Sequence, residues 1–87
     1  MDDVTVTEAP DLGRYEIRQA GALVGFAAYR DRGAARAFTH TEIDDRVGGR
    51  GLGTRLVRHA LDDTRARGLE IVPVCSFVAK VLDEEAA

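Results

Sequence analysis

Hydrophobic and polar positions alternate with a period of two along the first half of the chain. Residues 14–19 (RYEIRQ) alternate between charged and apolar side chains, which predicts a half-buried strand with Tyr15 and Ile17 facing inward. A more uniformly apolar strand is expected at 23–29, and a short edge strand at 4–7 (VTVT). The first half of the chain is therefore predicted to be an antiparallel meander.

A third strand of this meander is predicted at 35–43 (ARAFTHTEI), after turn residues Asp31, Arg32 and Gly33. Strict alternation divides its side chains between two faces, with Phe38, His40 and Glu42 on one and Ala37, Thr39, Thr41 and Ile43 on the other. His40 and Glu42 then share a face, on which they act either as a base with its orienting carboxylate or as a packed histidine beside a surface carboxylate.

The period changes to 3.6 after Gly51, which predicts an amphipathic helix. Its apolar side consists of Leu52, Leu56, Val57, Ala60 and Leu61. Asp63 and Arg67 are spaced for an ion pair along the helix, and Gly68 is placed to end it in a left-handed conformation.

The last part of the chain predicts one more strand and one more helix. The apolar run 69–74 (LEIVPV) is typical of a short buried strand closed by Pro73. Ser76 is expected to cap a final helix from Phe77 to about Glu84, with residues 84–87 frayed.

Composition excludes several classes of protein. The 87 residues, 45% hydrophobic and 31% charged, suit a single globular domain spanning residues 1–87. A net charge of -3 and a pI near 5.3 argue against nucleic-acid binding, and the sequence contains neither a leader nor a membrane span, so a cytoplasmic protein is expected. Cys75 cannot form an internal disulfide, and with His40 and His59 it makes no metal-ligand spacing.

A glycine-rich stretch, RVGGRGLGTRL at 46–56, joins the third strand to the first helix. Glycines let an anion approach the backbone, and the N–H groups and dipole of a helix start favour a phosphate or pyrophosphate; a plain flexible turn is the alternative. The antiparallel first half does not fit a dinucleotide fold, and Gly-Leu-Gly-Thr lacks the lysine of a nucleotide triphosphatase loop.

Three segments in order resemble the GNAT superfamily of N-acetyltransferases. GRGLGTRLVRHAL is similar to its acetyl-coenzyme A pyrophosphate loop and helix. FTHTEI and GLEIVPVCSFV are similar to the small single-domain acetyltransferase-like proteins that carry a His-Thr-Glu strand and a Pro-x-Cys motif. The resemblance covers residues 14–82.

The resemblance implies a minimal GNAT-like α+β (more broadly α/β) fold: a mostly antiparallel sheet of four to five strands with two helices and a pyrophosphate loop before the first helix. The strands at 35–43 and 69–74 would run parallel and splay apart to admit acetyl-coenzyme A. The residues implied to hold it are Thr41, Ile43, Gly48, Gly49, Arg50, Gly51, Leu52, Gly53 and Thr54.

The implied reaction is direct attack of an amine on the thioester, helped by a base and an acid. His40 and Glu42 are the candidates for the base. The usual tyrosine acid is missing from CSFVAKVLDEE, which leaves Cys75, Ser76 or water; Cys75 as a small core residue is the structural alternative.

The acceptor is expected to be a small-molecule or peptide amine, and the protein a monomer or homodimer. Two other hypotheses stay open. One is a non-catalytic coenzyme A-binding or protein-interaction module with the same fold, and the other is a protein that carries an acyl group on Cys75.

Overall fold

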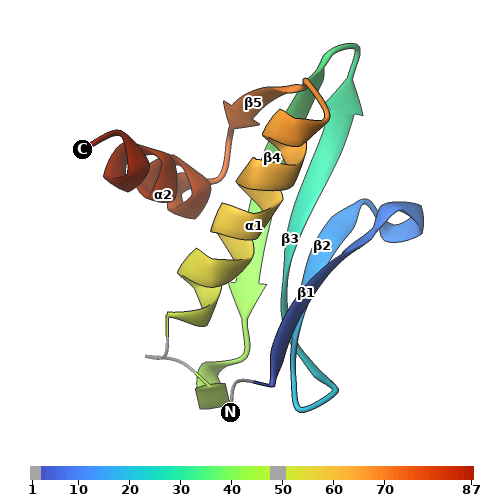
Figure 1. The fold of residues 1–87 in the computed structure, drawn as a ribbon, viewed down its shortest axis with the longest axis vertical. Coiled ribbons are helices and arrows are strands. Elements are labelled where there is room, and N and C mark those ends of the chain that lie inside the picture. The colour runs from blue at the N-terminus through green and yellow to red at the C-terminus, as the bar shows by residue number, and fades with distance from the viewer. Residues whose placement is uncertain (1–2, 48–50) are drawn as a thin grey trace.

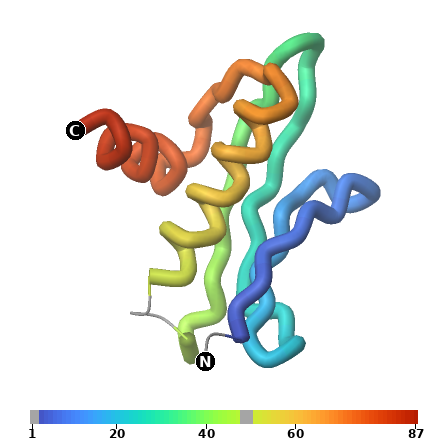
Figure 2. The backbone as a smooth tube through the Cα atoms, viewed as in Figure 1, coloured from blue at the N-terminus to red at the C-terminus, as the bar shows by residue number. Residues whose placement is uncertain are grey.

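The chain forms a five-stranded mixed sheet with two α-helices packed on one of its faces (Figures 1 and 2). The computed structural model describes residues 3–47 and 51–87. The elements are β1 (Val4–Ala9), β2 (Arg14–Gln19), β3 (Ala22–Arg32), β4 (Ala35–Ile43), α1 (Leu52–Ala66), β5 (Glu70–Pro73) and α2 (Ser76–Ala86), with short 3-10 turns at Pro10–Leu12 and Asp45–Val47. The strands lie in the order β1-β2-β3-β4-β5; the first four are antiparallel and β5 is parallel to β4. The minimal α+β fold implied by the sequence is therefore confirmed.

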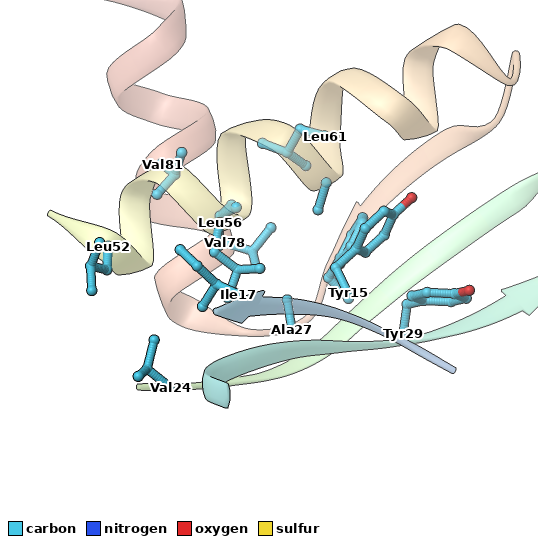
Figure 3. Close-up of a cluster of buried hydrophobic side chains, with 13 residues drawn as sticks. Tyr15, Ile17, Val24, Ala27, Tyr29, Leu52, Leu56, Leu61, Val78 and Val81 are labelled. Atoms are coloured by element: carbon cyan, nitrogen blue, oxygen red, sulfur yellow. The ribbon is translucent and has the colours of Figure 1, made fainter. Parts of the chain in front are cut away.

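The hydrophobic core lies between the inner face of the sheet and the two helices (Figure 3). Tyr15 and Ile17 are fully buried in it, as the alternation in β2 predicts. All five apolar positions predicted for α1 are buried as well, and α2 contributes Val78 and Val81. Because α1 lies across the sheet (Figure 1), its start is fixed relative to the end of β4.

A β-bulge in β4 reverses the alternation of its side chains. Phe38 pairs with Tyr29 and His40 with Ala28, so Thr39 is an extra residue opposite no partner in β3. After the bulge Thr41 and Ile43 face the helices, while His40 and Glu42 face the other side of the sheet. The predicted common face of Phe38, His40 and Glu42 is therefore wrong, because one inserted residue moves every later side chain to the opposite face.

β5 is an exposed edge strand rather than the buried strand predicted from its apolar run. Glu70, Val72 and Pro73 are exposed and only Ile71 is partly buried. β5 pairs with β4 on one side only, and no other strand among residues 3–47 and 51–87 pairs with its outer edge. The expected parallel pairing is present, over Ala35–Phe38 of β4.

The turns and helix ends differ from the predictions by a few residues. β3 continues through Arg32, so the turn into β4 rests on Gly33, whose φ of 55° is left-handed. Gly68 ends α1 with a φ of 73°, as predicted. Cys75, not Ser76, is the N-cap of α2, and the helix runs on to Ala86.

A buried arginine ties four strands together at the end of the sheet where β4 begins. The Arg36 side chain is 5% exposed, lies over the Tyr29 ring at 3.9 Å and donates to both carboxylate oxygens of Asp31 at 2.7 and 2.9 Å. It also donates to Glu8 at 3.2 Å and to the Tyr15 hydroxyl at 2.7 Å. We refer to Arg36 and these partners as the Arg36 network; its members come from β1 (Glu8), β2 (Tyr15), β3 (Tyr29 and Asp31) and β4 (Arg36).

The C-terminal end of α1 joins the Arg36 network through Asp63 and Arg67. Tyr15 donates to Asp63 at 2.6 Å, and Arg67 pairs with Asp63 at 2.9 Å, as the spacing predicts, and with Glu8 at 2.7 Å. Burial and the Asp63 hydrogen bond raise the pKa of Tyr15 to about 12. The Arg36 guanidinium lowers the pKa of Asp31, and the Tyr15 hydroxyl together with Arg67 lowers that of Asp63.

These lowered carboxyl pKa values predict a loss of stability in acid. A group whose pKa is lower in the folded state contributes its stability above its unfolded pKa and loses it as the pH falls through the folded value. We therefore expect the urea midpoint to be constant from pH 7 to pH 5 and to fall below about pH 4. The variant with Asp31→Asn and Asp63→Asn should show a weaker acid dependence, and equal pH profiles for the two proteins would contradict the assignment.

Candidate functional site

The pairing of β4 with β5 stops halfway along β4, which leaves a gap between the two strands. The last paired residues are Phe38 and Pro73, after which Cys75 N–H donates to the Phe38 carbonyl at 2.8 Å and the chain enters α2. The Thr41 N–H interacts with Cys75 Sγ, so the Thr41 backbone points toward the gap. By alternation the Ile43 backbone points the same way. Beyond Phe38 β5 thus gives β4 no strand partner among the described residues, and the splay of the two strands stays a prediction.

A cavity of about 260 Å³ lies where the end of β4 meets the start of α1. It is lined by Ile43, Val47, Gly51, Leu52, Gly53, Thr54 and Phe77. Gly51 has a φ of 70°, and a Cβ added there would meet no atom within 4 Å. The first hydrogen bond of the helix runs from Arg55 N–H to the Gly51 carbonyl, so the N–H groups of residues 52–54 precede the intrahelical ladder.

Gly53 faces a different neighbour. A Cβ at this position would lie 3.0 Å from Cζ of Phe77 and 3.5 Å from Cγ1 of Ile43. Phe77, from the first turn of α2, is partly buried against the core and forms one wall of the cavity. The close approach of α1 to this ring leaves little room for a side chain at position 53.

Cys75 lies in the gap, beside the open edge of β4. Its Sγ is 3.6 Å from Thr41 Oγ1, and the residue is only partly exposed. Burial raises the pKa of the thiol, but the Val78 N–H, the Thr41 hydroxyl and the N–H groups of Phe77 and Thr41 outweigh it, so the pKa lies below its ordinary value.

His40 and Glu42 lie on the opposite face of the sheet from this cavity. Their Nε2 and Oε1 atoms are 3.2 Å apart, and both side chains are more than half exposed. The His40 ring lies 5.9 Å from that of Phe26. A second hollow, of about 250 Å³, is lined by Leu23, Val24, Gly25, Phe26, Glu42 and Asp44.

The structure therefore divides the predicted site residues into three groups. Ile43, Gly51, Leu52, Gly53 and Thr54 share one cavity, with Thr41 and Cys75 in the adjoining gap. His40 and Glu42 are separated from them by the sheet. Gly48, Gly49 and Arg50, also predicted to hold the cofactor, lie outside the described residues.

Sequence reasoning missed Phe77 and Val47 as lining residues. Phe77 stands only two positions after Cys75, within the PVCSFV segment, but its apolar character indicated nothing more than a core position. Val47 belongs to a short 3-10 turn, Asp45–Val47, that the sequence did not predict.

The family model described as GCN5-related N-acetyl-transferase matches residues 14–87. None of the curated proteins compared with the chain matches it. Neither helix of the described structure is long and apolar enough to cross a membrane.

Solved acetyltransferases share the fold. A GCN5-like putative N-acetyltransferase from Staphylococcus aureus superposes with a TM-score of 0.71 at 23% identity, over 98% of this chain and 83% of that one. A ribosomal-protein-alanine N-acetyltransferase from Brucella melitensis biovar Abortus 2308 gives 0.63 at 22%, over 69% of this chain and 48% of that one. N-acetylglutamate synthase from Neisseria gonorrhoeae, complexed with coenzyme A and N-acetyl-glutamate, superposes with a TM-score of 0.60 at 18% identity, over 76% of this chain and 18% of that one. The chain thus matches about half of the Brucella enzyme and most of the Staphylococcus protein.

Proposed function

The chain belongs to the GCN5-related N-acetyltransferase family, and on that premise we propose that it binds acetyl-coenzyme A at the start of α1 and transfers the acetyl group to a primary amine. The observation that carries the proposal is the cavity of about 260 Å³ at the end of β4, which joins a left-handed Gly51 to the first N–H groups of a 15-residue helix. An anionic pyrophosphate fits this place, because the helix dipole and the N–H groups that precede the intrahelical ladder both favour negative charge there.

The open edge of β4 supports the same placement for the rest of the molecule. The backbone groups of Thr41 and Ile43 point into the gap beside β5, where amide groups of an extended arm can pair with them as a strand would. Gly48, Gly49 and Arg50 stay part of the proposed site on the evidence of the sequence. When bound, acetyl-coenzyme A supplies an acyl group activated as a thioester.

Cys75 is proposed as the acid of the reaction. Its thiol lies in the gap, and its lowered pKa brings proton loss closer to neutral pH, which favours transfer of the Sγ proton to a departing thiolate. Attack by the amine nitrogen forms the new C–N bond and breaks the C–S bond, while water accepts the surplus proton of the amine. We leave His40 and Glu42 out of this step, because both lie across the sheet from the cavity.

The position of His40 and Glu42 favours one alternative, a module that binds coenzyme A without turnover. Calorimetric titration with acetyl-coenzyme A, followed by mass spectrometry of primary amines and lysine peptides incubated with the protein, separates the two functions. We expect binding and acetylated acceptor. Binding without any acetylated amine would favour the module, and absence of binding at millimolar ligand would reject both.

Replacement of Cys75 by alanine tests the role of the thiol. The Cys75→Ala variant is expected to retain acetyl-coenzyme A affinity and cooperative unfolding while acetylating amines more slowly, because the ligand is held by the backbone and the acid is lost. An acetylated form of the wild-type protein itself, absent from the variant, would instead indicate an acyl group carried on Cys75. Equal rates for both proteins would remove the thiol from the mechanism.

A further inference from the structure

Among the described residues, Phe77 is the one aromatic residue that lines the cavity at the start of α1, and it belongs to the other helix, α2. It follows Cys75 by two residues and stands in the first turn of α2. The start of α2 is held in place by the bond from Cys75 N–H to the Phe38 carbonyl and by Val78, which is fully buried. The ring is therefore positioned by the sheet and the core rather than by α1.

Gly53 lies in close contact with this ring. Its Cα approaches the ring so closely that an added Cβ would lie 3.0 and 3.3 Å from Cζ and Cε2 of Phe77. Gly53 is also one of the residues lining the cavity, together with Ile43 and Thr54. The two glycines of GLG thus serve different needs: Gly51 adopts a left-handed conformation, while Gly53 makes room for a side chain.

We propose that Phe77 is a positioning residue of the cofactor site, which sets the shape of the cavity through its contact with Gly53. The inference rests on the proposed function, since it assigns the cavity to coenzyme A. The ring lines the cavity together with Ile43 and Gly53, so its position helps to set the space that is left for an entering ligand. An alanine at position 53 would force the ring to shift by a few tenths of an ångström, and we infer that this shift narrows the space that the ligand needs.

A rescue experiment distinguishes this role from direct contact between Gly53 and the ligand. Gly53→Ala is expected to weaken coenzyme A binding about tenfold, because overpacking of this size is relieved at the expense of the cavity. Its thermal midpoint should change little, since alanine favours the helix and opposes the cost of moving the ring. Adding Phe77→Leu, which removes the ring atoms nearest position 53, should return the affinity to within about threefold of that of the protein carrying Phe77→Leu alone.

Phe26 offers a matched control, because it is a partly buried phenylalanine on the opposite face of the sheet. Phe26→Leu combined with Gly53→Ala should bind as weakly as Gly53→Ala alone. Unchanged affinity in Gly53→Ala, or a loss that Phe77→Leu does not restore, would overturn the proposal while leaving the proposed function intact. If the wild-type protein binds no coenzyme A, the proposed function and this inference both fail.

Discussion

Gly51→Trp is expected to abolish coenzyme A binding while the protein still unfolds cooperatively. Gly51 lies on the wall of the cavity, and its Cβ direction meets no protein atom within 4 Å, so an indole would occupy the space proposed for the pyrophosphate. It would also stand in front of the N–H groups of residues 52–54. We expect calorimetric affinity to fall by at least about a hundredfold, which corresponds to roughly 3 kcal/mol.

Gly33→Trp is the control for the backbone strain in this experiment. Gly33 has a φ of 55°, also meets no atom within 4 Å of its Cβ position, and lies in the turn between β3 and β4. Both variants therefore carry the cost of a side chain in the left-handed region. Gly33→Trp should bind coenzyme A as the wild-type protein does; an equal loss in the two variants would show that strain, not blockage, removes binding.

Of all the substitutions we propose, Arg36→Met is expected to lower the free energy of unfolding most. Arg36→Met keeps an apolar stem but leaves Asp31, Glu8 and the Tyr15 hydroxyl without the guanidinium that they share. Breaking a buried ion pair from one side typically costs about 3 to 5 kcal/mol, a large part of the stability of a domain of this size. Urea unfolding at pH 7, followed by circular dichroism, measures the change directly.

Two further variants make the Arg36 result interpretable. Arg36→Lys retains the charge without the two-pronged geometry, so it should fold and lose less stability than Arg36→Met. Arg46→Met removes an exposed arginine that pairs with Asp44 at 2.7 Å, and it should leave the urea midpoint nearly unchanged. If Arg36→Met were as stable as the Arg46 variant, the Arg36 network would contribute no more than surface charge.

Most of the fold could be predicted from periodicity. The alternation in RYEIRQ identified Tyr15 and Ile17 as inward-facing, and the helical spacing from Leu52 to Leu61 identified the buried side of α1. Both patterns reflect burial on one face, which is what periodicity measures. The prediction of a buried strand from the apolar segment LEIVPV was wrong, because a run of apolar residues does not show whether a second strand covers it.

The site could be predicted only in part. The glycines at 51 and 53 were placed correctly at the start of α1, because a cluster of glycines in the sequence indicates a left-handed turn or a close approach to the backbone. The face of the sheet that His40 and Glu42 occupy was not predicted correctly. Nothing in FTHTEI marks Thr39 as a bulge, so a strict two-residue alternation carried through the segment gives the wrong face. The contact of Gly53 with Phe77 joins residues 24 positions apart, beyond the reach of any local pattern.

The Arg36 network and the cavity lie at opposite ends of β4, with Arg36 near its first residue and Ile43 at its last. Ile43 follows Arg36 by seven positions of extended strand, or about 20 Å. Substitutions that far apart, with no shared partner, act additively. Among variants that still fold, substitutions around Arg36 should therefore change the free energy of unfolding while leaving the affinity for a ligand at the other end of the same strand unchanged.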